Sequence, residues 1–205
     1  VEAGLNILLT SYDDLYVNDK MLPAGNLREK IDGASRAQFI VVTKCPENLS
    51  ENNQFEITKK LNVNLHQTVF FSTINYANNI ISKNDIIDLD GLSNYEVVLV
   101  TGIAKTKPLT EFLNKEKIRF KHLQFSDHHN FTKANINTII TTYNKINSSK
   151  KLILTTEKDY VRSFMKLDEP IYYLSIKTKF INHQDDFNKL IKKYVGQNTG
   201  NSNIH

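Results

Sequence analysis

Residues 95–117, YEVVLVTGIAKTKPLTEFLNKEK, decide the fold, because an apolar run is followed there by a glycine and then by an amphipathic segment. The run at 95–100 predicts a buried strand. Pro108 suits the first turn of a helix that continues through Lys117. A strand followed by a helix in this way is a βα unit, the building block of sheets with parallel strands.

The same alternation of apolar runs and amphipathic stretches extends outward on both sides of this unit. It predicts an α/β fold with a mostly parallel sheet flanked by helices. Further strands are predicted at 5–10, 39–43, 68–72, 120–125, 151–155 and 171–176, and helices at 27–37, 50–60, 132–144 and 185–194.

The regular pattern breaks between residues 76 and 94, where short apolar pieces alternate with turn residues. This segment predicts a small β-ribbon or hinge. It would separate residues 1–75 from an α/β subdomain at 95–196. The Gly/Asn/Ser-rich residues 197–205 are expected to form a disordered tail.

Composition restricts the class of protein. Of 205 residues, 40% are hydrophobic and 23% charged, and the absence of a long apolar run excludes a transmembrane helix. A single cysteine, Cys45, excludes an intramolecular disulfide. The net charge of +4 suits an anionic partner, but the aromatic residues do not interleave with Lys and Arg as a nucleic-acid surface requires.

Ligands of parallel α/β sheets gather at the carboxyl ends of the strands, so polar residues after the apolar runs are the first candidates. Near the first strand, Gly25 permits a tight turn, Arg28 could grip a phosphate and Glu29 could hold Mg²⁺. The alternative for these residues is a turn followed by a surface ion pair.

Two further groups follow later strands. Asp127 beside His128 could serve proton transfer or metal binding, and the alternative is a capping aspartate with two solvated histidines. Lys158 could contact a phosphate, although the turn around it also suits an ordinary acidic helix start. The phosphate-loop spacing G-x-x-x-x-G-K-S/T occurs nowhere in the sequence.

Taken in order, these groups resemble the tetraacyldisaccharide 4′-kinases, the lipid A 4′-kinases of Gram-negative bacteria. The most specific run is LPAGNLRE at 22–29. The other matching runs are RA at 36–37, VVTKCP at 41–46, TGI at 101–103, FSDHHNF at 125–131 and TTEKD at 155–159.

The resemblance implies a P-loop-type kinase, peripheral on the cytoplasmic face of the inner membrane, that moves the γ-phosphate of ATP to the 4′-hydroxyl of a lipid-linked glucosamine disaccharide with Mg²⁺. It implies that His128 takes the hydroxyl proton and that Asp127 orients His128. Arg28 and Lys158 would contact phosphate, and Glu29 would lie near Mg²⁺.

One departure from the family is large. The ATP-cradling loop, a catalytic aspartate and a paired acidic motif of the family all precede the region that matches Val1. We therefore expect the chain to be a C-terminal portion, with residues 1–75 the remainder of the N-terminal kinase core. These residues alone are expected to be inactive, while the intact protein is a kinase.

Two other functions fit parts of the sequence. A DHH-type metal-dependent phosphoesterase would use the run DLDG at 88–91 together with Asp127 and His128. A non-catalytic basic binding module would use only the positive charge.

Overall fold

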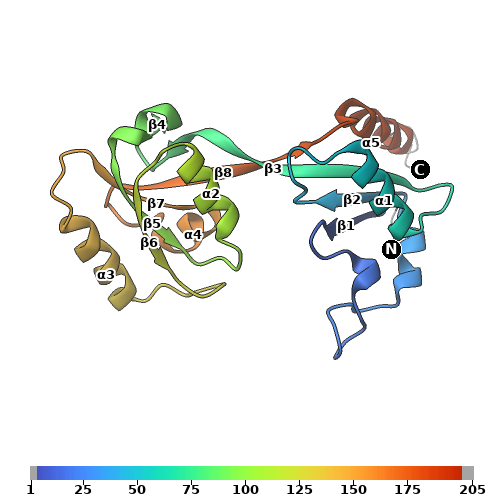
Figure 1. Cartoon of the computed structure of the whole chain (residues 1–205), viewed down its shortest axis with the longest axis horizontal. Helices are drawn as coiled ribbons and strands as arrows, with labels where there is room; N and C mark the ends of the chain where they lie inside the picture. Colours follow the sequence, from blue (N-terminus) through green and yellow to red (C-terminus); the bar gives the residue numbers. More distant parts are fainter. Residues whose placement is uncertain (1–3, 200–205) are drawn as a thin grey trace, which may run out of the picture. The chain divides into compact units, whose positions relative to one another are not determined.

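Strands and helices alternate along residues 4–199, the part of the chain that the computed structural model describes (Figure 1). The strands are β1 Ile7–Ser11, β2 Phe39–Thr43, β3 Thr68–Ile81, β4 Ile86–Asp88, β5 Glu96–Thr101, β6 Phe120–Gln124, β7 Lys151–Thr156 and β8 Ile171–Phe180. The α-helices are α1 Glu51–Leu61, α2 Lys107–Lys115, α3 Lys133–Asn144, α4 Glu157–Asp159 and α5 Gln184–Thr199. Shorter helical turns are η1 Tyr16–Asn18, η2 Ile31–Arg36, η3 Leu89–Asn94 and the π-helical η4 Tyr160–Phe164.

The strands follow the order β1-β2-β3-β8-β7-β5-β6 in the sheet. The pairs β1–β2, β2–β3, β7–β8, β5–β7 and β5–β6 are all parallel, which confirms the mostly parallel α/β fold. An antiparallel pair joins β3 to β4, from Asn79 opposite Asp88 to Ile81 opposite Ile86. This short pair lies within residues 76–94, where the sequence predicts a small β-ribbon or hinge.

The contacts divide the chain into two units. Among the described residues, unit 1 holds 4–75 and 178–199, and unit 2 is Tyr76–Lys177. The division after Asn75 coincides with the start of the expected hinge. Residues 178–196 differ from the expectation, since they belong with unit 1 and not with the subdomain that begins at residue 95.

Unit 1 has helices on both faces of its strands. Alternate residues Ile40 and Val42 of β2 pack with Ile57 and Leu61 of α1. The intervening Phe39 and Val41 pack instead with α5, whose contacting side chains are Phe187, Leu190 and Ile191. The second face explains why α5 returns to unit 1, because without it a row of aromatic side chains would lie in water.

Unit 2 repeats this arrangement around β5 and β7. Val97 and Leu99 of β5 pack with Leu109 and Leu113 of α2. Val98 and Val100 face the other side and pack with Ile139 of α3. The strands β5 and β7 are buried on both faces, which is why their central residues, 97–100 and 152–154, are all apolar.

The structure corrects several expected element boundaries. The helix predicted at 27–37 is only the 3₁₀ turn Ile31–Arg36, because Leu27 exchanges backbone hydrogen bonds with Lys20 and Leu22 across a loop. Strands predicted at 68–72 and 171–176 continue to Ile81 and Phe180.

The end of the chain also differs from the expectation. The predicted disordered tail began at residue 197, but α5 continues to Thr199. Residues 200–205 lie outside the described residues. Among residues 4–199, no helix combines the length and the apolar character needed to cross a bilayer.

Candidate active site

The carboxyl ends of three neighbouring strands in unit 2 bring candidate residues together. Strand β5 lies between β6 and β7, and all three run parallel. Their ends lead to Gly102 after β5, to Asp127 and His128 after β6, and to Lys158 after β7. Residues more than 50 positions apart in the chain thus meet at one edge of the sheet.

Three charged or titratable side chains form a cluster at this edge. The Lys158 ammonium Nζ lies 3.5 Å from His128 Nε2 and 3.9 Å from Asp127 Oδ1. Asp127 Oδ2 lies 3.7 Å from His128 Nε2, which is beyond a hydrogen bond. The His128 side chain is 72% exposed, so the imidazole is open to a ligand from solvent.

The His128 backbone adopts an unusual conformation. Its φ is 54°, in the left-handed region that residues other than glycine rarely occupy. Its N–H donates to the carbonyl of Gly102 at 3.1 Å and to Asp127 Oδ1 at 2.9 Å. Asp127 therefore orients His128 through the backbone and not through the ring, and the retained strain is typical of a functional position.

A buried carboxylate lies behind the cluster. Asp159 is fully buried. Its Oδ2 accepts the Gly102 N–H at 2.8 Å and the Thr156 hydroxyl at 2.9 Å, and its Oδ1 accepts Arg162 Nη2 at 2.8 Å. These bonds connect the end of β5 with the end of β7 and with η4.

His129 has a different environment from its neighbour. Its Nε2 lies 3.0 Å from Asn135 Oδ1, at the start of α3, and its ring packs between Phe125 and Phe131. The alternative of two solvated histidines at this turn therefore fails for His129, which joins the loop to α3.

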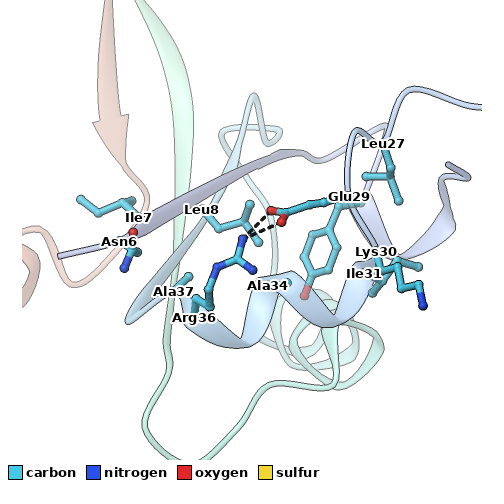
Figure 2. Close-up of a pocket in the computed structure, with 12 residues that line it drawn as sticks. Asn6, Ile7, Leu8, Leu27, Glu29, Lys30, Ile31, Ala34, Arg36 and Ala37 are labelled. Carbon is cyan, nitrogen blue, oxygen red and sulfur yellow. Dashed lines mark hydrogen bonds and ion pairs between the residues drawn. The ribbon is translucent and has the colours of Figure 1, made fainter. Parts of the chain in front are cut away.

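Arg28 and Glu29 belong to unit 1. Both Glu29 carboxylate oxygens accept hydrogen bonds from Arg36 Nη2, at 2.7 and 2.6 Å. Figure 2 shows this pair at a cavity of about 220 Å³ between β1 and η2. Arg28 is exposed, and within residues 4–199 it makes no hydrogen bond or ion pair.

These residues do not fit a metal site in this geometry. Glu29 is occupied by a guanidinium cation, which repels Mg²⁺, and no group of three His, Cys, Asp or Glu side chains suited to a metal occurs in the described part of the chain. The surface ion pair considered as the alternative for Glu29 is what the structure contains.

Sequence reasoning quoted Arg36 and Asp159 only within matching runs and gave no role to either of them or to Arg162. A signal for Asp159 was available, because Thr156 followed three residues later by an acidic residue is the pattern of a capped helix start, and the Thr156 side chain does accept the Asp159 N–H. The pairing of Glu29 with Arg36 had no such signal, since Arg36 lies seven positions further along the chain.

Comparison with known proteins identifies the family. The model of the tetraacyldisaccharide-1-P 4′-kinase family matches residues 1–196. The chain belongs to this family. It is 48% identical to a tetraacyldisaccharide 4′-kinase of Flavobacterium johnsoniae over 97% of this chain. It is 39% identical to a tetraacyldisaccharide 4′-kinase of Bacteroides thetaiotaomicron over 100% of this chain.

The chain spans only part of these kinases, 56% of the first and 58% of the second. A crystal structure of the Aquifex aeolicus enzyme LpxK in complex with ATP has the same fold, with a TM-score of 0.63 and 22% identity over 94% of this chain and 53% of that one. The predicted family and the α/β fold are thus confirmed. The run at 88–91 is a coincidence of short motifs and does not indicate a DHH-type phosphoesterase.

Proposed function

We propose that the protein containing this chain transfers the γ-phosphate of ATP to the 4′-hydroxyl of a tetraacyl glucosamine disaccharide in lipid A biosynthesis. The observation that carries the proposal is the family match over residues 1–196, together with the cluster of Asp127, His128 and Lys158 at the carboxyl ends of parallel strands. Ligands of open α/β sheets bind at such edges.

In the proposed reaction, His128 accepts the proton of the sugar hydroxyl as its oxygen forms a bond to the γ-phosphorus. The bond from that phosphorus to the bridging oxygen breaks, and ADP leaves. His128 suits this role because its imidazole is exposed and its Nδ1 has no hydrogen-bond partner within residues 4–199.

The neighbouring charges have complementary roles in the proposal. The Lys158 ammonium only donates hydrogen bonds, and its Nζ lies 3.5 Å from His128 Nε2. From this place it donates to an oxygen of the phosphoryl group during transfer. Asp127 holds the His128 backbone in its left-handed conformation. Arg28 is an exposed guanidinium without a partner in the described chain, which suits a phosphate contact.

ATP binding requires a phosphate cradle, and the G-x-x-x-x-G-K-S/T loop does not occur in residues 1–205. We propose that another part of the protein supplies it and that residues 1–205 alone are inactive. Catalysis of phosphoryl transfer depends on positioning and charge neutralisation, both of which need the cradle. Mg²⁺, if the reaction uses it, requires ligands other than the Glu29 arrangement described above.

The proposed substrate places the protein at a membrane. Its acyl chains reside in a bilayer, and ATP is cytoplasmic, so we propose peripheral contact with the cytoplasmic face of the inner membrane. The net charge of +4 is compatible with anionic lipid there.

The test uses the longest reading frame that contains these residues. ATP-dependent phosphorylation of the disaccharide lipid is measured for that protein, for residues 1–205 alone, and for His128→Ala. We expect activity only in the longer protein and a loss of at least about 100-fold in His128→Ala.

His183→Ala is the matched control. His183 is also an exposed histidine beside an aspartate, at 3.0 Å from Asp186, but lies outside the cluster. The activity of the His183→Ala variant should equal that of the unmodified protein. A longer protein without kinase activity, or one indifferent to His128, would contradict the proposal and favour the basic binding module.

A further inference from the structure

The buried Asp159 carboxylate connects the segments that carry the proposed catalytic residues. A buried ion is costly unless it is paired and hydrogen-bonded. Asp159 meets this condition with donors from Gly102, Thr156 and Arg162, which come from three different segments of unit 2. The carboxylate is therefore a junction that none of these segments could satisfy alone.

Gly102 links the Asp159 carboxylate to His128 through two backbone hydrogen bonds. Its N–H donates to Asp159 Oδ2, and its carbonyl accepts the His128 N–H at 3.1 Å. The glycine is also closely enclosed, since a Cβ at this position would lie 3.2 Å from Asp159 Oδ1 and 3.4 Å from Arg162 Nη2. The backbone after β5 thus rests directly on the carboxylate, and the strained His128 backbone rests on Gly102.

Lys158 directly precedes Asp159 in the sequence and lies in the turn that Thr156 caps. Thr156 Oγ1 accepts the Asp159 N–H at 3.2 Å and so closes the first turn of α4 around Lys158. The helix then continues as the π-helical η4, a form often found near functional sites. The Thr156 hydroxyl also donates to Asp159 Oδ2 at 2.9 Å. The carboxylate therefore holds the residue that caps this turn, and the direction in which Lys158 leaves the turn depends on Asp159.

We propose that Asp159 is a positioning residue for phosphoryl transfer, which holds His128 through Gly102 and Lys158 through the turn of α4. The inference rests on the proposed function. Asp159 itself is fully buried and touches no substrate. Its contribution is the placement of a base and a cation, and small displacements of such groups are expensive for a reaction that depends on alignment.

Asp159→Asn in the full-length kinase tests the proposal. The amide keeps the volume of the carboxylate but has one acceptor oxygen and a donor group, so it cannot accept from Gly102, Thr156 and Arg162 together. We expect kcat to fall by about 10- to 100-fold while KM for ATP stays within about twofold. Gly102→Ala, which inserts a methyl group against the carboxylate, should give the same pattern, and the double variant should lose little more than either single one.

Asp85→Asn is the matched control, because Asp85 is a carboxylate of unit 2 that accepts the Tyr172 hydroxyl at 2.8 Å away from this junction. It should leave kcat unchanged. A second readout, hydrogen exchange of the His128 amide by NMR, does not depend on activity. Exchange should accelerate in Asp159→Asn and Gly102→Ala but not in Asp85→Asn.

The two readouts separate the possible failures. If the unmodified protein phosphorylates the lipid but Asp159→Asn keeps its kcat, or loses only thermal stability, Asp159 is structural and the inference is overturned. If the unmodified protein is inactive, the proposed function fails, and unchanged His128 exchange would overturn the coupling as well. If Asp159→Asn does not fold, Gly102→Ala decides by the same criteria.

Discussion

At the scale of single residues, burial separates side chains that appear equivalent in the sequence. His128 and His129 are adjacent, yet the first is open to solvent in a strained backbone conformation and the second packs between two aromatic rings. Asp127 and Asp159 differ in the same way, one partly exposed and one fully buried. The chemistry of each is decided by its surroundings and not by its type.

Cys45 illustrates how burial suppresses reactivity. Burial raises the pKa of its thiol from the ordinary value of 9.0 to about 11. At pH 8 the thiolate fraction, and with it the rate of alkylation by iodoacetamide, should be about 100-fold lower in the folded chain than in urea. Equal rates in the folded and unfolded states, measured by mass spectrometry, would contradict this.

His122 predicts a pH dependence of stability. Burial lowers the pKa of its imidazole below the ordinary value of 6.5, and its Nε2 lies 2.8 Å from the buried Thr101 hydroxyl. The unfolded chain binds the His122 proton more tightly than the folded chain does. The contribution of neutral His122 to the free energy of unfolding is therefore fully present above pH 6.5 and is lost as the pH falls from there toward the folded pKa.

The urea concentration at the midpoint of unfolding should therefore be lower at pH 5.5 than at pH 7.5, and this difference should be smaller in His122→Gln. An identical pH profile for both proteins would show that His122 does not contribute.

At the scale of elements, helix starts were predicted well because capping residues are local signals. Ser50 and Thr132 both cap helices whose starts the sequence indicated, at α1 and α3. The helix predicted at 27–37 does not form over its whole length. The reason lies outside the predicted helix, because the Leu27 backbone is hydrogen-bonded across the loop to Lys20.

The capping box of α3 allows a quantitative test. Thr132 Oγ1 accepts the Asn135 N–H at 3.3 Å, and Asn135 Oδ1 accepts the Thr132 N–H at 3.0 Å. Thr132→Ala should lower the free energy of unfolding by about 0.5–2 kcal/mol.

Thr138→Ala in the same helix is the control, because its hydroxyl bonds only to the Ala134 carbonyl on an exposed face. It should be neutral or slightly stabilising. Urea denaturation compares the two, and equal losses would contradict the capping argument.

At the scale of the whole molecule, the chain passes from unit 1 into unit 2 along β3 and returns along β8. The return is stabilised by α5, where the Phe187 ring lies 5.1 Å from that of Phe70 and 4.6 Å from that of Phe180. Strand β1 ends the sheet order, and Leu9 on it is 65% exposed.

Phe187→Ala tests the assignment of the C-terminal segment to unit 1. Loss of the ring should destabilise unit 1 by about 2–4 kcal/mol and accelerate hydrogen exchange in β2, with little change in β7. Leu113→Ala, in the core of unit 2, should give the opposite pattern. Equal acceleration in β2 and β7 by both variants would mean that the two units unfold together.

The sequence by itself determined the α/β class, most strands, the capped helices and the family. Each of these depends on local periodicity, on short-range capping or on ordered motifs such as the run at 22–29. It also selected Asp127, His128 and Lys158 as candidates, because polar residues after apolar runs fall at strand ends in any parallel sheet.

Only the tertiary structure decided which candidates meet and which are occupied. Pairing of β5 with β6 and β7 joins His128 to Lys158, whereas an ion pair with Arg36 occupies Glu29. The burial of the Asp159 carboxylate against the Gly102 N–H and the return of α5 to unit 1 were equally beyond local patterns. Each depends on contacts between residues distant in the chain, and such contacts arise from packing and burial, which no window of sequence contains.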